Sequence, residues 1–318
     1  MATDRRLAAL LLALVAAVAA PASAQAPALD SLARRLMSIP APLGYESSMA
    51  DSIAALPRGT ANVSRDRAGN VLLSLGSGAP ARLVACPMDE PGWVVGGIRD
   101  DGYLTIRRLP GSMARDADER LEGQRISLIG SKGLVRGVVG VRSIHLTRGR
   151  SGSGSVFTVD NAYVDVGASS AGEARDLGIE VTTPLVLEKR AHAYGENLLA
   201  APEAGTRAAC AALVRAASGA RVRGSVTVAF VVEQRLSARG LRTILNQRGP
   251  FGDVVVLGAA DSIGSAVSVD SIRTGGSSRA ARWRVRVRHQ GTPVETVSLA
   301  DVKVLEERLQ RWLAGAAP

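Results

Sequence analysis

Few residues of this chain stand in a pattern that could support catalysis. Three histidines and two cysteines are present, and no pair of them has the close helical or strand spacing of a metal site. No G-x-S-x-G segment is present, so the sequence gives no support to Ser-His-Asp hydrolysis. The most informative segment is residues 85–92, ACPMDEPG, which continues a buried strand. Metal-assisted hydrolysis needs anionic or imidazole side chains at fixed positions, and Pro87 offers no donor near the carboxylate of Asp89.

The elements that would position this segment alternate between strands and helices. Nearly continuous apolar strands are predicted at residues 83–85, 226–232 and 254–257. Helices are predicted between and around them, at residues 32–37, 46–56, 207–217, 241–247 and 302–313. Buried strands separated by helices favour an α/β fold, with a mostly parallel or mixed sheet covered by helices on both faces.

Residues 92–163 have a different texture, in which short β-rich pieces alternate with glycine. This pattern predicts a small β-barrel-like domain inserted into the larger one. We therefore expect a discontinuous α/β domain made of residues 27–90 and 165–318, with the inserted domain at residues 91–164.

The N-terminus is predicted to be a signal peptide, residues 1–24. Two arginines precede an apolar run that is short for a membrane span, and an A-x-A-like cleavage site follows, so the mature chain would begin near Gln25. A twin-arginine signal is the alternative. We expect an exported protein, periplasmic or extracellular, with no transmembrane anchor after cleavage.

The net charge of +10 does not by itself indicate a nucleic-acid-binding protein. The basic residues are scattered arginines, and aromatic residues make up only 3% of the chain, so there is no stacking platform. We expect no specific nucleic-acid partner, while contact with a polyanion or an anionic envelope stays open.

Cys86 and Cys210 are the only cysteines. An oxidising compartment would allow them to pair, but the sequence cannot place them within bonding distance. Two separate buried thiols, acting as small apolar side chains, are the favoured interpretation.

Several motifs, in this order and spacing, resemble those of the co-catalytic metallo-aminopeptidases, the family that includes glutamyl aminopeptidase and the tetrahedral aminopeptidases. The likeness covers nearly the whole mature chain. It rests on LGYE, DRAGN, MDEPG, DVGASS with the EA that follows, and VETV with a later aspartate, at residues 43–46, 66–70, 88–92, 165–170, 173–174, 294–297 and 301.

The resemblance implies two adjacent divalent ions, zinc or cobalt, that activate a bridging water while a glutamate moves the proton. Transferred one by one, the positions of the ligands and of the base carry residues that cannot do this work: Pro87, Ala201, Gln234, Arg235, Ala259 and Gly291. Asp89 survives, which in the family supports the first histidine. A one-residue slip would put Glu233 at the base position but would break the match at Arg239-Gly240.

The arginine at position 235 suggests how the site could balance its charge without these ligands. We expect its guanidinium to take over the electrostatic role of the cation and to pair with Asp89 or Glu233. The chain holds further potential ligands, although none forms a persuasive pair: His145, His192, His289, Asp253 and Asp261.

These features predict an exported aminopeptidase-like protein that is not catalytic and binds a peptide or a protein, or serves as a structural subunit. No cofactor is expected, and the resemblance implies a homo-oligomer. The alternative is an active metal-dependent aminopeptidase with altered ligands.

Overall fold

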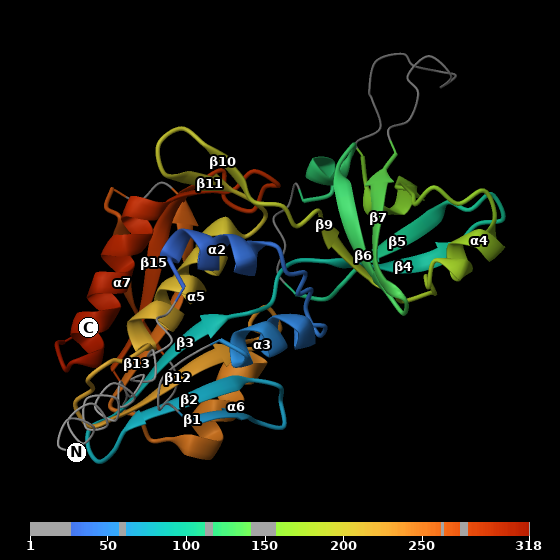
Figure 1. The fold of residues 1–318 in the computed structure, drawn as a ribbon. Helices are drawn as coiled ribbons and strands as arrows, with labels where there is room; N and C mark the ends of the chain where they lie inside the picture. The colour runs from blue at the N-terminus through green and yellow to red at the C-terminus, as the bar shows by residue number, and fades with distance from the viewer. Residues whose placement is uncertain are drawn as a thin grey trace, which may run out of the picture.

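The computed structural model describes residues 27–56, 62–111, 117–140, 157–261, 264–273 and 279–317. The predicted signal peptide and His145 lie outside these residues. The described chain forms a large mixed sheet with helices and, beside it, a closed β-barrel (Figure 1). No helix in these ranges has the length and apolar character needed to cross a membrane.

The large sheet has the strand order β1-β2-β12-β3-β13-β15-β16-β11-β10, with β14 paired to β15. Its central strands β12, β3, β13 and β15 are parallel, and the outer pairings are antiparallel. The bounds are β1 Asn62–Arg65, β2 Val71–Gly76, β3 Ala81–Pro87, β10 His192–Tyr194, β11 Leu198–Ala200, β12 Ser225–Val231, β13 Asp253–Asp261, β14 Val267–Ile272, β15 Arg279–Arg288 and β16 Thr296–Ser298.

Helices cover both faces of this sheet, as the sequence predicted. Side chains of β3 alternate between two cores: Val84 and Cys86 face one, and Leu83 and Ala85 face the other. The first core is closed by α2 (Leu29–Met37), α3 (Ser47–Ala54), α5 (Ala204–Ala217) and α7 (Leu299–Leu313), and the second by α6 (Arg239–Arg248). The α/β fold class is therefore confirmed.

The small residues of α5 let this helix pack directly against the sheet. From Ala208 to Ala217 every residue except Leu213, Val214 and Arg215 is alanine or cysteine, and nearly all of these residues are buried. At Gly205 an added Cβ would stand only 2.4 Å from Val287 Cγ1 and 2.5 Å from Ala259 Cβ. Any larger residue would push the start of α5 away from the carboxyl ends of β13 and β15, so glycine fixes this approach.

The barrel is closed by six strands in the order β4-β5-β8-β7-β6-β9 around its own apolar core. Because β9 completes it, the barrel reaches Leu187, beyond the boundary at residue 164 expected from the sequence; the division into domains itself stays a prediction. Its elements are β4 Trp93–Ile98, β5 Leu104–Arg108, η1 Glu119–Leu121, β6 Arg125–Gly130, β7 Gly133–Val139, η2 Val159–Asn161, β8 Val164–Asp165, α4 Ala171–Asp176 and β9 Pro184–Leu187.

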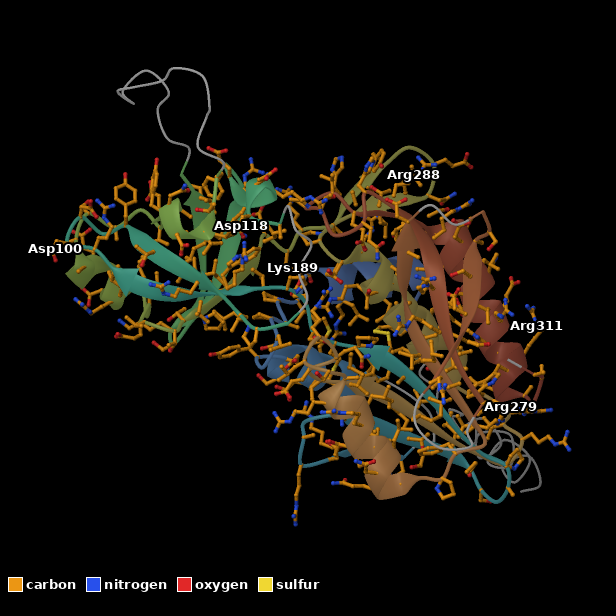
Figure 2. The ribbon with its side chains drawn as sticks, turned by 180° about the vertical axis from the view of Figure 1, so that it is seen from behind. Asp100, Asp118, Lys189, Arg279, Arg288 and Arg311 are labelled. Carbon is orange, nitrogen blue, oxygen red and sulfur yellow. A yellow bond between two sulfur atoms is a disulfide. The ribbon has the colours of Figure 1, made fainter. Side chains whose placement is uncertain are left out.

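A buried ion cluster joins the two bodies where the chain enters and leaves the barrel. Glu90 follows β3 and is held by Lys189 Nζ at 2.7 Å and by Arg207 Nη2 at 3.3 Å. Its other hydrogen bond comes from the Ala41 N–H, 2.8 Å away. Burial opposes ionisation, but the two cations outweigh it and hold the pKa of Glu90 below its usual value. Lys189 lies at the junction of barrel and sheet (Figure 2), so loss of any member would leave uncompensated buried charge.

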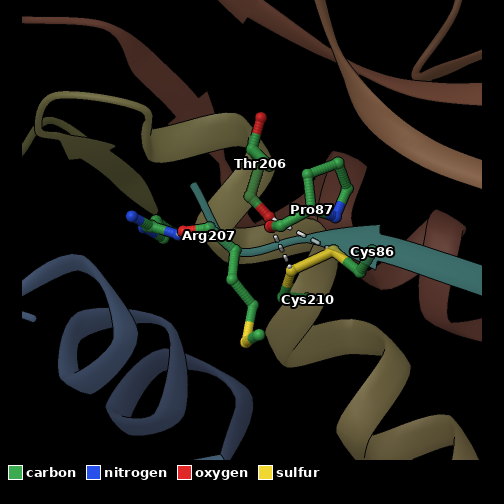
Figure 3. Close-up of a disulfide and its surroundings, with 6 residues drawn as sticks. Cys86, Pro87, Thr206, Arg207 and Cys210 are labelled. Carbon is green, nitrogen blue, oxygen red and sulfur yellow. Dashed lines mark hydrogen bonds between the residues drawn. A yellow bond between two sulfur atoms is a disulfide. The ribbon is translucent and has the colours of Figure 1, made fainter. Parts of the chain in front are cut away.

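Cys86 on β3 and Cys210 on α5 form a disulfide, with Cα atoms 5.6 Å apart (Figure 3). The favoured interpretation of two separate thiols was therefore wrong. Sequence spacing could not show that β3 carries Cys86 on the face that α5 covers. The bond ties the helix to the strand one residue before Pro87.

We expect the Cys86→Ala/Cys210→Ala variant to lose about 2–4 kcal/mol of unfolding free energy, because the bond closes a long loop in the unfolded chain. The two cysteines are separated by 124 positions. Urea unfolding of oxidised protein, reduced protein and the variant measures this loss. The reduced wild type is the matched control and should resemble the variant; equal midpoints for oxidised and reduced protein would contradict the prediction.

Candidate functional site

A pocket of about 670 Å³ lies at the carboxyl ends of the central parallel strands, the position where open α/β sheets bind ligands. We call it the carboxyl-end pocket. The barrel forms part of its wall through Trp93, Leu121 and Leu187. Its volume is within the range of sites for small ligands.

Most of the positions singled out in the sequence converge on this pocket. It is lined by Pro87, Asp89, Gln234, Arg235, Ala259 and Gly291. Ala201 does not line it but is buried behind its neighbours Pro202 and Glu203, which do. Glu233 points elsewhere, and its carboxylate pairs with Arg239 Nη1 at 2.7 Å. Six of the eight positions taken from the family resemblance therefore lie in one cavity, and Ala201 and Glu233 do not.

The loop at residues 232–238 is held in place through its backbone by side chains from three other motifs. Asn70 Oδ1 accepts the N–H of Val232 at 3.0 Å, and Glu46 Oε1 accepts that of residue 233 at 3.0 Å. Asp89 accepts the next two N–H groups, at 3.1 and 2.8 Å. Motifs found separately in the sequence therefore act on one loop.

This loop also contains strained backbone. Glu233, Ser237 and Ala238 have φ values of 50°, 51° and 53°, in the left-handed region that non-glycine residues rarely occupy. Such residues persist only where their surroundings determine them strongly, and they concentrate at binding sites. Here the hydrogen bonds from the loop N–H groups to Asn70, Glu46 and Asp89 hold the loop in this conformation.

Asp89 is buried, with 2% of its surface exposed. Burial raises the pKa of this carboxyl, and the N–H groups of Arg235 and Gln234 oppose the rise. Its two oxygens are occupied by these N–H groups, so its main role in this structure is to hold the loop.

Arg235 turns its guanidinium into the pocket, where Nη2 lies 2.8 Å from Glu203 Oε1. The expectation that it would pair with Asp89 or Glu233 was wrong about the direct partner: Glu233 binds Arg239, and Asp89 accepts the backbone N–H of Arg235. The charge of Asp89 nevertheless acts on the guanidinium and helps to raise its pKa. Glu203 was missed, although it is the only carboxylate in the aligned turn at residues 201–205. Glu203 could therefore have been recognised from the sequence as a candidate partner of Arg235.

Glu295 is the second residue that the sequence reasoning missed, although it belongs to the last recognised motif. It is buried and accepts the N–H groups of Gly205 at 2.9 Å and Gly291 at 2.8 Å. Burial and then repulsion by Glu203 raise the pKa of Glu295 to about 7. Gln234 lies nearby in the lining, and its buried side-chain oxygen has no hydrogen-bond partner in the described residues.

The donors do not fit a pair of divalent ions. Among the described residues, no three His, Cys, Asp or Glu side chains come together in a group that could hold a metal ion. None of the possible replacement ligands within those residues lines the pocket: His192 stacks on Tyr194, Asp253 binds Arg279, and His289 and Asp261 lie elsewhere.

The model of the M42 glutamyl aminopeptidase family matches residues 69–249, which is more than half of the chain. Two curated relatives are each 30% identical over 214 residues: the putative aminopeptidase SgcX of Escherichia coli, over 65% of this chain and 56% of its own length, and the lysyl aminopeptidase of Pyrococcus furiosus, over 66% and 61%. The chain therefore matches less than two thirds of these relatives.

The family match contradicts the expectation that no metal cofactor is needed. Members of this family are metal-dependent aminopeptidases, so metal dependence is the property that the match implies. The described side chains do not supply the corresponding ligand group.

Solved structures show the same fold. An aminopeptidase of Desulfurococcus kamchatkensis has a TM-score of 0.79 at 19% identity and covers 91% of this chain and 95% of its own. The TET1 peptidase of Pyrococcus horikoshii has a TM-score of 0.77 at 20% identity and covers 91% and 100%. The matched residues 69–249 make up more than half of the chain and include β3, β12 and the loop at residues 232–238, so the chain belongs to the M42 glutamyl aminopeptidase family.

Proposed function

We propose that this aminopeptidase-like protein binds peptides in the carboxyl-end pocket without hydrolysing them. The observation that carries the proposal is the ion pair of Arg235 with Glu203 inside the pocket. Arginine keeps its charge at all physiological pH values, so it supplies a fixed cation and cannot act as a base. Gln234, at the position of the base, is an amide and cannot take up a proton under these conditions.

A peptide fits the polar groups of this pocket. Gln234 lines the pocket, and its side-chain amide can both donate to and accept from a peptide backbone. Asp89, Glu203 and Glu295 lie in the part of the pocket that holds Arg235, while Arg282 and Arg284 line another part. The carboxylates of Glu203 and Glu295 would attract the ammonium group at the start of a peptide chain.

Export stays a prediction, and the disulfide supports it because such bonds persist in oxidising compartments.

Self-assembly through the barrel is a further part of the proposal. Leu134 and Val138 project from the same side of β7 and are 54% and 45% exposed. The related TET1 peptidase of Pyrococcus horikoshii can assemble into a tetrahedron or an octahedral shell.

We expect light scattering after size exclusion to give a mass that is a multiple of the monomer. Leu134→Asp should shift the protein towards the monomer, because it puts a charge into an apolar contact. Val304→Asp on α7 is the matched control, since Val304 is also exposed, at 44%. A monomer at every concentration would remove this part of the proposal.

The raised pKa of Glu295 makes a prediction about stability. The folded state holds a proton there up to about pH 7, whereas the unfolded chain releases it near the ordinary value of 4.5. The stabilisation that this proton gives to the folded state is therefore complete below pH 4.5. It is lost as the pH rises to 7, which lowers the unfolding free energy by about 3 kcal/mol. Glu295→Gln should reduce this decline, although Glu46 and Asp89, whose pKa values are also raised, act in the same direction.

Urea unfolding gives the unfolding free energy of the variant and of the wild type at pH 5 and at pH 7.5. The difference between variant and wild type is then compared between the two pH values. Glu307→Gln on the exposed side of α7 serves as the control and should leave that difference at zero. Parallel pH profiles for wild type and Glu295→Gln would refute the prediction.

The function itself is tested by calorimetry with short alanine peptides together with an assay of aminoacyl-arylamide hydrolysis, with added Zn²⁺ or Co²⁺ and with a chelator. We expect saturable binding and no turnover. Glu203→Gln should weaken binding about tenfold or more, because it removes pocket charge and the partner of Arg235. Glu307→Gln should bind like the wild type. Hydrolysis that the chelator abolishes, or that Glu295→Gln abolishes, would replace this proposal with an active aminopeptidase.

A further inference from the structure

The wall of the carboxyl-end pocket that lies along β13 and β15 is basic. Arg282 and Arg284 are on one side of β15, opposite the buried Trp283 and Val285, and both line the pocket. Arg120 reaches the pocket from the barrel at another place, where its Nη1 donates to the Gly291 carbonyl at 3.1 Å and the N–H of Gly291 donates to Glu295. The basic wall is therefore formed by Arg282 and Arg284 of β15.

The two guanidinium groups of this wall differ in their partners. Arg284 pairs with Asp270 of β14 at 2.7 Å. Arg282 is exposed, and within the described residues its guanidinium makes no hydrogen bond or ion pair. The free-energy cost of desolvating this exposed guanidinium when an anion binds would be small. Its two parallel N–H donors match the two oxygens of a carboxylate.

The wall and the carboxylates line the same pocket. Gly258 is in register with Arg284 on the neighbouring strand, and its lack of a side chain leaves only Arg284 Cγ within 4 Å of an added Cβ, at 3.9 Å. Val256, in register with Arg282, comes three residues before Ala259. Three residues of strand span about 10 Å, which is also the reach of about three extended peptide residues.

The pocket thus has an acidic part, with Glu203 and Glu295, and a basic wall, with Arg282 and Arg284. We propose that it selects short peptides, of two or three residues, with both ends free: the terminal ammonium lies at Glu203 and Glu295, and the terminal carboxylate lies at Arg282. This assignment rests on the proposed peptide-binding function and adds the class of ligand.

A carboxylate could come from the end of the peptide or from an acidic side chain, and the two sources are separable. The probes are trialanine, its C-terminal amide, its N-acetyl form, and Ala-Ala-Glu with an amidated C-terminus. Calorimetry with the wild type should show trialanine binding at least tenfold more tightly than its amide or its N-acetyl form. Ala-Ala-Glu amide should bind as weakly as trialanine amide.

Arg282→Gln should reduce the preference for trialanine over its amide to about twofold or less, while the preference over the N-acetyl peptide remains. Arg288→Gln is the matched control, because Arg288 is exposed on the same side of β15 but lies at the strand's far end from Arg279 and outside the pocket (Figure 2). It should bind all four probes like the wild type. Because the side chain of Arg282 is exposed, its replacement should not disturb folding, which circular dichroism checks.

Equal binding of trialanine and its amide to the wild type would overturn the inference and leave peptide binding intact. Tight binding of Ala-Ala-Glu amide would overturn the assignment to the chain terminus. Failure of every probe to bind would overturn the proposed function as well, so the two failures are distinguishable.

Discussion

The structure around the carboxyl-end pocket depends on buried acceptors that hold the backbone of residues 232–238. Asp89, Glu46 and Asn70 come from three separate segments, and each accepts N–H groups from this loop. Unpaired N–H groups in a buried loop would cost about 1–3 kcal/mol each, so these acceptors stabilise a conformation that contains several left-handed residues. A loop fixed through its backbone can change its side chains without losing its shape. This explains how an amide and a guanidinium can stand where the family resemblance implies a base and a ligand, on a recognisable framework.

The same constraint places the charges. Because the loop is fixed, Arg235 reaches Glu203, whose own backbone is left-handed, with φ of 59°. Burial and then repulsion by Glu203 account for the raised pKa of Glu295. At the junction with the barrel, by contrast, Glu90 is matched by two buried cations. Glu90 thus serves the junction and Asp89 holds the loop, while Glu203 and Glu295 remain in the pocket to interact with a ligand.

Sequence reasoning found the α/β class and most of the pocket because both depend on local patterns. Runs such as residues 226–232 read as buried strands, and motifs at strand ends meet at one edge of a parallel sheet. It failed where the outcome depends on how segments that are distant in the sequence are oriented relative to one another in the fold. Cys86 could not be matched to Cys210 without knowing which face α5 covers, and the partner of Arg235 depended on a left-handed turn at Glu203 that no local pattern indicates. The late closure of the barrel by β9 was missed for the same reason, since strand pairing is not local.

The positions of the basic and acidic residues follow from one geometric fact, that the strands β13 and β15 run parallel to β3. Residues at the strand ends meet the loops that carry Glu203 and Glu295, while residues earlier in β15 face the pocket from its wall. Alternation then brings Arg282 and Arg284 to the same side and buries Trp283 between them on the other. With α6 covering the neighbouring strands, the arginine side of β15 borders the pocket instead of a helix. Opposite charges at its two ends are therefore built into the register of the sheet, and a ligand that carries both charges is the chemistry that this register would favour.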